Sequence, residues 1–155
     1  MNIPLIKEDY KPATSIYNIR KPEISSGAVY YFETESGLVY QVTFGKKKNN
    51  YLGNIINFSV ISDEYEDEYS ETNRGEVYRI ISTMIEIIRI YHENHPYSNS
   101  YEFSGEYKDQ RDDEEASIRT KLYMREAKRV VDLHNWELTR NENKVTLMKK
   151  IRNER

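Results

Sequence analysis

The chain has 155 residues, enough for one domain with a substantial core but short for two. Its 23 basic and 26 acidic side chains give a net charge of −3, so it lacks the basic excess of nucleic-acid-binding proteins. The absence of cysteine excludes disulfides, thiolate metal ligands and a cysteine nucleophile. No apolar run approaches the about 18 residues of a membrane span, and the N-terminus lacks a signal-peptide core. We therefore expect a soluble cytoplasmic protein with neither a membrane nor a nucleic-acid partner.

The N-terminal segment differs in pattern from the rest of the chain. Pro4, Pro12 and Pro22 break its periodicity, as is typical of an irregular arm or of a strand followed by loops. Periodic segments begin soon after the last of these prolines. We therefore predict an N-terminal arm over residues 1–26 and a single α+β domain over residues 27–155.

Three strands are predicted in the first half of this domain. Residues 28–35 and 38–44 alternate between apolar and polar side chains on either side of Gly37, which predicts an antiparallel hairpin. The lysine and asparagine residues at 45–50 indicate a solvated loop. Residues 54–61, NIINFSVI, are rich in β-branched and aromatic side chains and predict a third strand.

A helix is the strongest prediction of the sequence. Over residues 75–93 the apolar side chains recur at the helical spacing of three and four, which places them on one stripe. The acidic run of residues 62–73 before the helix indicates a solvated loop. We expect residues 63–71 to be mobile or ordered only by a partner, because they have too little apolar surface to offset the entropy of ordering. Pro96 stops the helix, and residues 100–105 predict a strand.

The last third of the chain adds a second helix and a hairpin. Residues 116–133 have helical spacing, and the acidic residues before them suit a helix N-terminus. Residues 136–140 and 144–150 predict two strands joined by a turn. The predicted fold is therefore α+β with a mostly antiparallel sheet, in the order β-β-β-α-β-α-β-β.

The inward positions of these elements predict the core. Strand alternation and the helical stripe place apolar residues on one face of each element. We expect the following side chains to be largely buried: Val42, Phe44, Ile56, Phe58, Val60, Ile81, Met84, Ile88, Phe103, Leu122 and Trp136.

Three short motifs occupy fixed places in this order of elements: Asn73-Arg74-Gly75 at the start of the first helix, Leu122-Tyr123 in the second, and Asn135-Trp136 at the last hairpin. Together with the order, they resemble the C-terminal two-thirds of the fold of the GCN5-related acetyltransferases, over residues 28–150. The second helix also resembles small uncharacterised phage-encoded proteins that share an R-x-K-L-Y-x-R pattern, here formed by Arg119, Lys121, Leu122, Tyr123 and Arg125.

The resemblance implies a binding site for acetyl-coenzyme A. The cofactor would lie on Asn73, Arg74 and Gly75, where free backbone N–H groups at a helix N-terminus suit a pyrophosphate. Tyr123 would protonate the leaving thiolate. The glycine-rich turn of the family is reduced here to one glycine, and Glu76 adds a carboxylate where the pyrophosphate would bind, so the cofactor loop is degenerate.

Other catalytic and metal motifs are incomplete. Glu106 and Lys108 form an E-x-K half-motif of metal-dependent nucleases, with Asp63 as a possible first carboxylate, but this spacing is common by chance in a chain that is 32% charged. His92 and His95 are three residues apart without a third ligand at suitable spacing. We therefore expect no metal and no cofactor.

Two functions follow as expectations. The first is a non-enzymatic binding or interaction protein of phage or mobile-element type on an acetyltransferase-like scaffold, with a protein partner or a second copy of the chain. The candidate contact residues are tyrosines that flank the first helix in sequence: Tyr65, Tyr69, Tyr97 and Tyr101. The alternative is a divergent acyltransferase dependent on acetyl-coenzyme A, with Tyr123 as its acid.

Overall fold

The computed structural model of the protein describes residues 3–60, 74–104, 113–141 and 144–151. The acidic segment of residues 62–73 and the E-x-K half-motif lie outside this part of the chain, and so do the predictions made for them. Within the described residues, neither helix combines the length and apolar character needed to cross a lipid bilayer.

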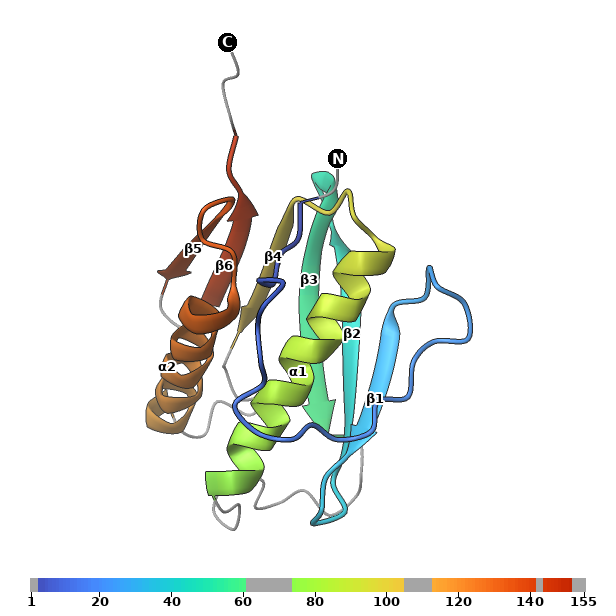
Figure 1. Cartoon of the computed structure of the whole chain (residues 1–155), viewed down its shortest axis with the longest axis vertical. Helices are drawn as coiled ribbons and strands as arrows, with labels where there is room; N and C mark the ends of the chain where they lie inside the picture. The colour runs from blue at the N-terminus through green and yellow to red at the C-terminus, as the bar shows by residue number, and fades with distance from the viewer. Residues whose placement is uncertain (1–2, 61–73, 105–112, 142–143, 152–155) are drawn as a thin grey trace. The chain divides into compact units, whose positions relative to one another are not determined.

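The structure confirms the α+β class and the mostly antiparallel sheet (Figure 1). In chain order the elements are β1 (Val29–Glu33), β2 (Val39–Lys47), β3 (Asn50–Val60), α1 (Arg74–Asn94), β4 (Ser100–Ser104), α2 (Asp113–Val130), β5 (Trp136–Asn141) and β6 (Lys144–Lys149). The hydrogen-bonded strand order is β1-β2-β3-β4-β6-β5. Strands β3 and β4 are parallel, as a crossover through α1 allows, while β6 runs antiparallel to both β4 and β5.

The chain forms two compact units, which we describe separately. Unit 1 contains residues 1–10, 46–56 and 96–155, and unit 2 contains residues 11–45 and 57–95. The predicted N-terminal arm is therefore shared between them, with its first ten residues in unit 1 and the remainder in unit 2. A single domain over residues 27–155 stays a prediction.

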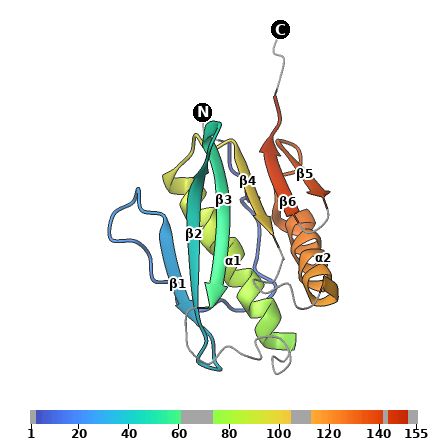
Figure 2. The same ribbon diagram turned by 180° about the vertical axis from the view of Figure 1, so that it is seen from behind.

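Unit 2 is built around aromatic rings between α1 and the strands β1 and β2, which lie in front of the helix in Figure 2. Phe44 stacks on Tyr91 of α1 with 3.9 Å between ring centroids, and Phe32 stacks on Tyr40 at 5.1 Å. The predicted helical stripe is confirmed, because α1 buries the following side chains: Ile80, Ile81, Met84, Ile87, Ile88 and Tyr91. The predicted burial of Val42 and Phe44 is confirmed as well.

One predicted core residue of unit 2 is less buried than expected. Phe58 is only half-buried, although it stacks on Tyr40 at 5.7 Å between centroids. It lies two residues beyond Ile56, where the described pairing of β3 with β4 ends. The side chain of Val60 lies outside the described residues.

The outer edge of β1 in unit 2 is partly covered. The backbone N–H of Arg20 donates to the carbonyl oxygen of Tyr31 at 2.8 Å, and the N–H of Tyr31 donates back at 3.1 Å. The guanidinium of Arg20 lies 5.3 Å from the centre of the Tyr31 ring. The irregular segment before β1 thus forms a short bridge along the strand.

Unit 1 buries its apolar side chains beneath α2. Trp136 is fully buried, and its predicted core position is confirmed together with those of Ile56 and Phe103. Leu122 is only half-buried, so the prediction for it is wrong by one position. Tyr123 is buried instead, because the inward stripe of α2 runs through Tyr123, Ala127 and Val130 at spacings of four and three.

The first residues of the chain are packed into unit 1. Leu5 and Ile6 are buried. The backbone N–H of Asp132 donates to the carbonyl oxygen of Leu5 at 2.9 Å, and the indole Nε1 of Trp136 donates to the carbonyl oxygen of Pro4 at 3.2 Å. This part of the predicted arm is therefore strand-like and anchored to the end of α2.

Candidate functional site

Large apolar side chains are exposed mainly in unit 1. Across the described residues seven such side chains are exposed, and only Ile24 belongs to unit 2. Tyr51, Tyr97 and Ile151 are the most exposed of the rest, at 84%, 75% and 94% of their surface. The six in unit 1, which we call the strand-end surface, are Tyr51, Leu52, Tyr97, Leu133, Met148 and Ile151.

Backbone hydrogen bonds join the segments that carry these side chains. The N–H of Asn99 donates to the carbonyl oxygen of Leu52 at 2.8 Å, and the N–H of Lys149 donates to the carbonyl oxygen of Asn99 at 2.9 Å. The N–H of Lys150 donates to the carbonyl oxygen of Asn135 at 2.9 Å. The bonded residues lie next to the starts of β3, β4 and β5 and to the end of β6. Figure 1 shows that β3 and β4 begin, and β6 ends, at the same end of the sheet. The six side chains therefore belong to neighbouring segments and not to scattered positions.

The strands beneath this surface are closely fitted. The Asn50 side-chain amide donates from Nδ2 to Oδ1 of Asn99 at 2.9 Å, which links the starts of β3 and β4. Gly53 pairs with Ser100 across the same strands, and a Cβ atom at Gly53 would lie 2.8 Å from Oγ of Ser100 and 2.6 Å from Cδ of Lys47. A Cβ atom at this position would therefore require the neighbouring side chains to shift, so the strands are closely packed here.

Two of the four predicted contact tyrosines lie in the described residues, and they differ. Tyr97 is exposed and belongs to the strand-end surface. Tyr101 is fully buried, with its ring centroid 6.1 Å from that of Trp136, so its side chain is not accessible to a partner. Tyr65 and Tyr69 lie outside the described residues.

Sequence reasoning missed five members of this surface: Tyr51, Leu52, Leu133, Met148 and Ile151. For the first two a signal was present. The signal was the pair Tyr51-Leu52 directly after a turn of lysines and asparagines. Successive strand residues point to opposite faces, so two adjacent apolar residues at a strand start cannot both face the core.

Of the residues implied by the acetyltransferase resemblance, Tyr123 belongs to unit 1, and Arg74 and Gly75 belong to unit 2. The Tyr123 side chain is only 5% exposed and contacts Phe103 edge to face, with 5.3 Å between centroids and 72° between ring planes. Arg74 is the first residue of α1 and Gly75 lies in its first turn. Asn73 lies outside the described residues.

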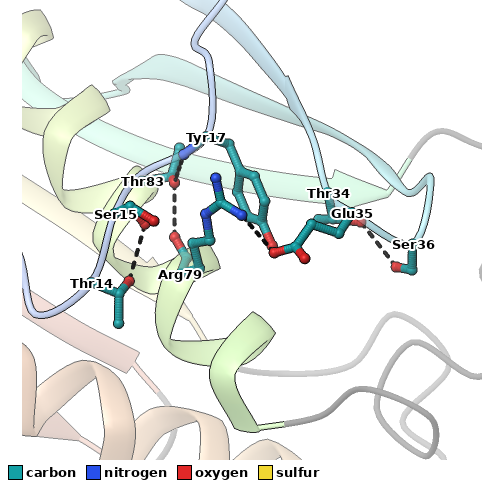
Figure 3. Close-up of polar contacts among 8 residues, drawn as sticks. All are labelled: Thr14, Ser15, Tyr17, Thr34, Glu35, Ser36, Arg79 and Thr83. Carbon is teal, nitrogen blue, oxygen red and sulfur yellow. Dashed lines mark hydrogen bonds and ion pairs between the residues drawn. The ribbon is translucent and has the colours of Figure 1, made fainter.

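A polar cluster in unit 2 joins α1 to the segments on either side of β1 (Figure 3). Nη1 of Arg79 donates to Oε1 of Glu35 at 2.5 Å, and the guanidinium lies 4.1 Å from the centre of the Tyr17 ring. Oγ1 of Thr83 accepts from the backbone N–H of Tyr17 at 2.9 Å and donates to the carbonyl oxygen of Arg79 at 2.8 Å. These contacts hold the irregular segment around Tyr17 against the helix, which is a structural role.

The buried tyrosines of unit 2 are unsuited to acid–base chemistry near neutral pH. Burial, and to a smaller extent the neighbouring Tyr30, raise the pKa of the Tyr91 hydroxyl to about 12. Burial also raises the pKa of Tyr30, against a hydrogen bond to Asn94 that lowers it. A general acid or base works best with a pKa near the working pH, so these hydroxyls act in packing.

The histidines likewise have structural surroundings. Nδ1 of His95 lies 2.9 Å from the carbonyl oxygen of Tyr91, and its ring stacks on the Tyr91 ring at 3.9 Å between centroids. His92 is buried, while His134 is exposed in the other unit. Among the described residues no three His, Asp or Glu side chains are grouped so as to hold a metal ion.

Comparison with known proteins finds no match to this chain among protein-family models, curated proteins or solved structures. Its function must therefore be argued from its own residues, and the strand-end surface is the feature that packing within unit 1 does not explain.

Proposed function

We propose that this chain is a non-enzymatic binding protein that docks a protein partner on the strand-end surface. The observation that carries the proposal is the grouping of six exposed apolar side chains along one end of unit 1. Monomeric proteins expose single apolar side chains routinely, whereas several of them on neighbouring segments favour an interaction site.

The types of residue support a protein partner. Tyr51 and Tyr97 offer large rings with few rotatable bonds, and tyrosine is one of the residues that most often dominates the energy of an interface. Leu52, Met148 and Ile151 add aliphatic surface around these rings. Removal of this apolar area from water would stabilise a complex by roughly 25 cal/mol per Å² before the costs of association.

The proposal is tested by comparing how much of the protein partner is captured by the wild-type chain and by the double variant Tyr51→Ser/Tyr97→Ser. Wild type and the control Ile24→Ser, which changes an exposed residue of unit 2, should retain the same partner. The double variant should lose it while keeping the wild-type melting temperature. Equal retention by the double variant would overturn the proposal.

The second candidate is a divergent acyltransferase that uses acetyl-coenzyme A. Two features support it: the parallel pairing of β3 and β4 around α1, and the succession of three strands, helix, strand, helix and hairpin. Acetyl-coenzyme A at a hundred times its dissociation constant would then stabilise the fold by about 2.7 kcal/mol. Turnover of acetyl-coenzyme A with a panel of amines, lost in Tyr123→Phe, would establish this candidate in place of the first.

A further inference from the structure

Three lysines lie close to members of the strand-end surface. Lys48 is exposed in the turn before β3, three residues from Tyr51. Lys149 and Lys150 follow Met148 directly and precede Ile151. Among the described residues neither Lys48 nor Lys150 forms an ion pair with an acidic side chain, and both side chains are exposed.

Of three acidic groups near the strand-end surface, Glu102 is neutralised by ion pairs, whereas the hydrogen-bond donors to Asp132 are uncharged. Glu102 of β4 lies between two lysines, with 3.3 Å from Oε1 to Nζ of Lys47 and 3.8 Å from Oε2 to Nζ of Lys144. Asp132, beside Leu133, accepts from Nδ2 of Asn135 at 2.7 Å and from the backbone N–H of His134 at 3.2 Å. Glu137, opposite Met148 in the register of β5 and β6, is an exposed acid within the rim.

The lysines are placed to contact a ligand at the edge of the apolar side chains. Nζ of Lys150 donates to the carbonyl oxygen of Leu133 at 3.0 Å, which holds this ammonium group beside a member of the surface. Nζ of Lys149 lies 5.7 Å from the centre of the Trp136 ring. Rim charges of this kind select a partner by its charge, while the apolar centre supplies most of the affinity.

From this arrangement we infer that the partner segment is an acidic peptide with apolar or aromatic anchors. The inference rests on the proposed function and adds the chemistry of the partner. The carboxylates of the peptide would contact Lys48, Lys149 and Lys150. Its apolar anchors would lie among Tyr51, Tyr97 and the aliphatic side chains. Because the whole chain carries a charge of −3, the attraction comes from this local lysine rim and not from the overall charge.

Single-stranded nucleic acid is the competing ligand, since lysines and tyrosines also bind phosphates and bases. The aliphatic half of the surface, formed by Leu52, Leu133, Met148 and Ile151, offers neither stacking nor hydrogen bonds to a base. These side chains fit the anchors of a peptide, and the observations therefore favour a protein segment.

The test measures fluorescence anisotropy with three labelled probes: a panel of twelve-residue peptides that alternate Asp or Glu with Leu or Phe, the same panel with lysine in place of the acids, and twelve-residue oligothymidylate. We expect the acidic peptides to bind at least tenfold more tightly than either other probe. Their affinity should fall as salt is raised from low to high concentration, since exposed charges are screened.

The variants separate charge from apolar contact. Lys48→Glu/Lys149→Glu should weaken binding of the acidic peptides at least tenfold and abolish the preference over the lysine peptides. Lys21→Glu, an exposed lysine of unit 2, is the matched control and should bind as wild type does. Lys48→Gln, which leaves the Lys149 contact with Trp136 intact, repeats the test in a milder form if the double variant unfolds.

Each result bears on the inference in a defined way. Equal binding of acidic and lysine peptides, lost in Tyr51→Ser/Tyr97→Ser, would overturn the acidic partner and leave the binding function intact. Tighter binding of oligothymidylate would replace the peptide by nucleic acid. Failure of all three probes would overturn the inference, while the capture experiment with the tyrosine variant still decides the proposed function separately.

Discussion

The tyrosines of unit 2 and those of the strand-end surface have opposite environments. Tyr30 and Tyr91 are each 1% exposed, and the Tyr91 ring stacks on Phe44 beneath α1. Tyr51 and Tyr97 expose most of their surface at strand and loop ends in unit 1. The same residue type therefore supplies core in one place and an accessible ring in the other. What decides between them is whether the side chain lies between α1 and the strands, which composition does not reveal.

The largest expected effect is in the core of unit 2. Ile88→Ala removes a buried side chain of α1 and should lower the free energy of unfolding by about 2–5 kcal/mol, because of lost apolar burial and a residual cavity. Ile24→Ala removes the same atoms from an exposed position and should change it by less than about 0.5 kcal/mol. Urea denaturation of both variants measures the difference. Equal effects would contradict the burial of Ile88.

The base of the strand-end surface should be nearly as sensitive. Gly53→Ala places a Cβ atom too close to Oγ of Ser100 and to the Lys47 chain, so it should destabilise the protein by about 1–3 kcal/mol. Adding Ser100→Ala removes one of these atoms and should recover part of the loss. Ser100→Ala alone is the control. No loss in Gly53→Ala, measured by thermal unfolding, would show that the strands are more loosely fitted there.

Alkaline pH should lower the stability of the fold through the buried Tyr91 hydroxyl. The Tyr91 hydroxyl has a pKa of about 12 in the fold and about 10 when unfolded, so its proton is held more tightly in the folded state. The corresponding stability is complete below about pH 10 and is lost as the pH rises towards 12, on the order of 1–2 kcal/mol. Tyr91→Phe keeps the ring and should reduce this dependence.

The control for this titration is Tyr97→Phe, which removes an exposed hydroxyl. Urea midpoints measured from pH 8 to 11.5 provide the comparison. If the urea midpoint falls with pH by the same amount in Tyr91→Phe and in wild type, groups other than Tyr91 cause the loss of stability.

The smallest effect on stability should accompany the largest effect on binding. Tyr51→Ser/Tyr97→Ser changes only exposed rings and should alter the free energy of unfolding by less than about 1 kcal/mol in total. The same variant should lose the captured partner. A large loss of stability would mean that these rings contribute to the fold, and the comparison between the two sets of tyrosines would fail.

Much of the fold was predictable because it depends on local periodicity. The stripe of Ile81, Met84 and Ile88 in α1, and the alternation through Val42 and Phe44 in β2, are confirmed as buried. The prediction failed for Leu122, where two adjacent apolar residues of a helix competed for one inward position and Tyr123 occupies it.

The candidate surface could not be predicted in the same way. It joins segments from Tyr51 to Ile151 that come together only through pairing between distant strands, and sequence alone does not give their register. Tyr101 was predicted as a contact residue from its position near the helix, but it packs near Trp136, 35 positions later in the chain. Tyr97 was identified and is exposed; a role in binding remains a proposal.

The bridge between Arg20 and Tyr31 has a consequence for association. An open strand edge offers unpaired N–H and C=O groups to any other extended chain and thereby promotes aggregation. The two hydrogen bonds of this bridge use the N–H and C=O groups of Tyr31, and the Arg20 guanidinium places a positive charge beside the edge. The segment before β1 thus hinders the addition of a foreign strand to unit 2 at this position. This protection against aggregation matters more in a protein that also exposes the rings of Tyr51 and Tyr97.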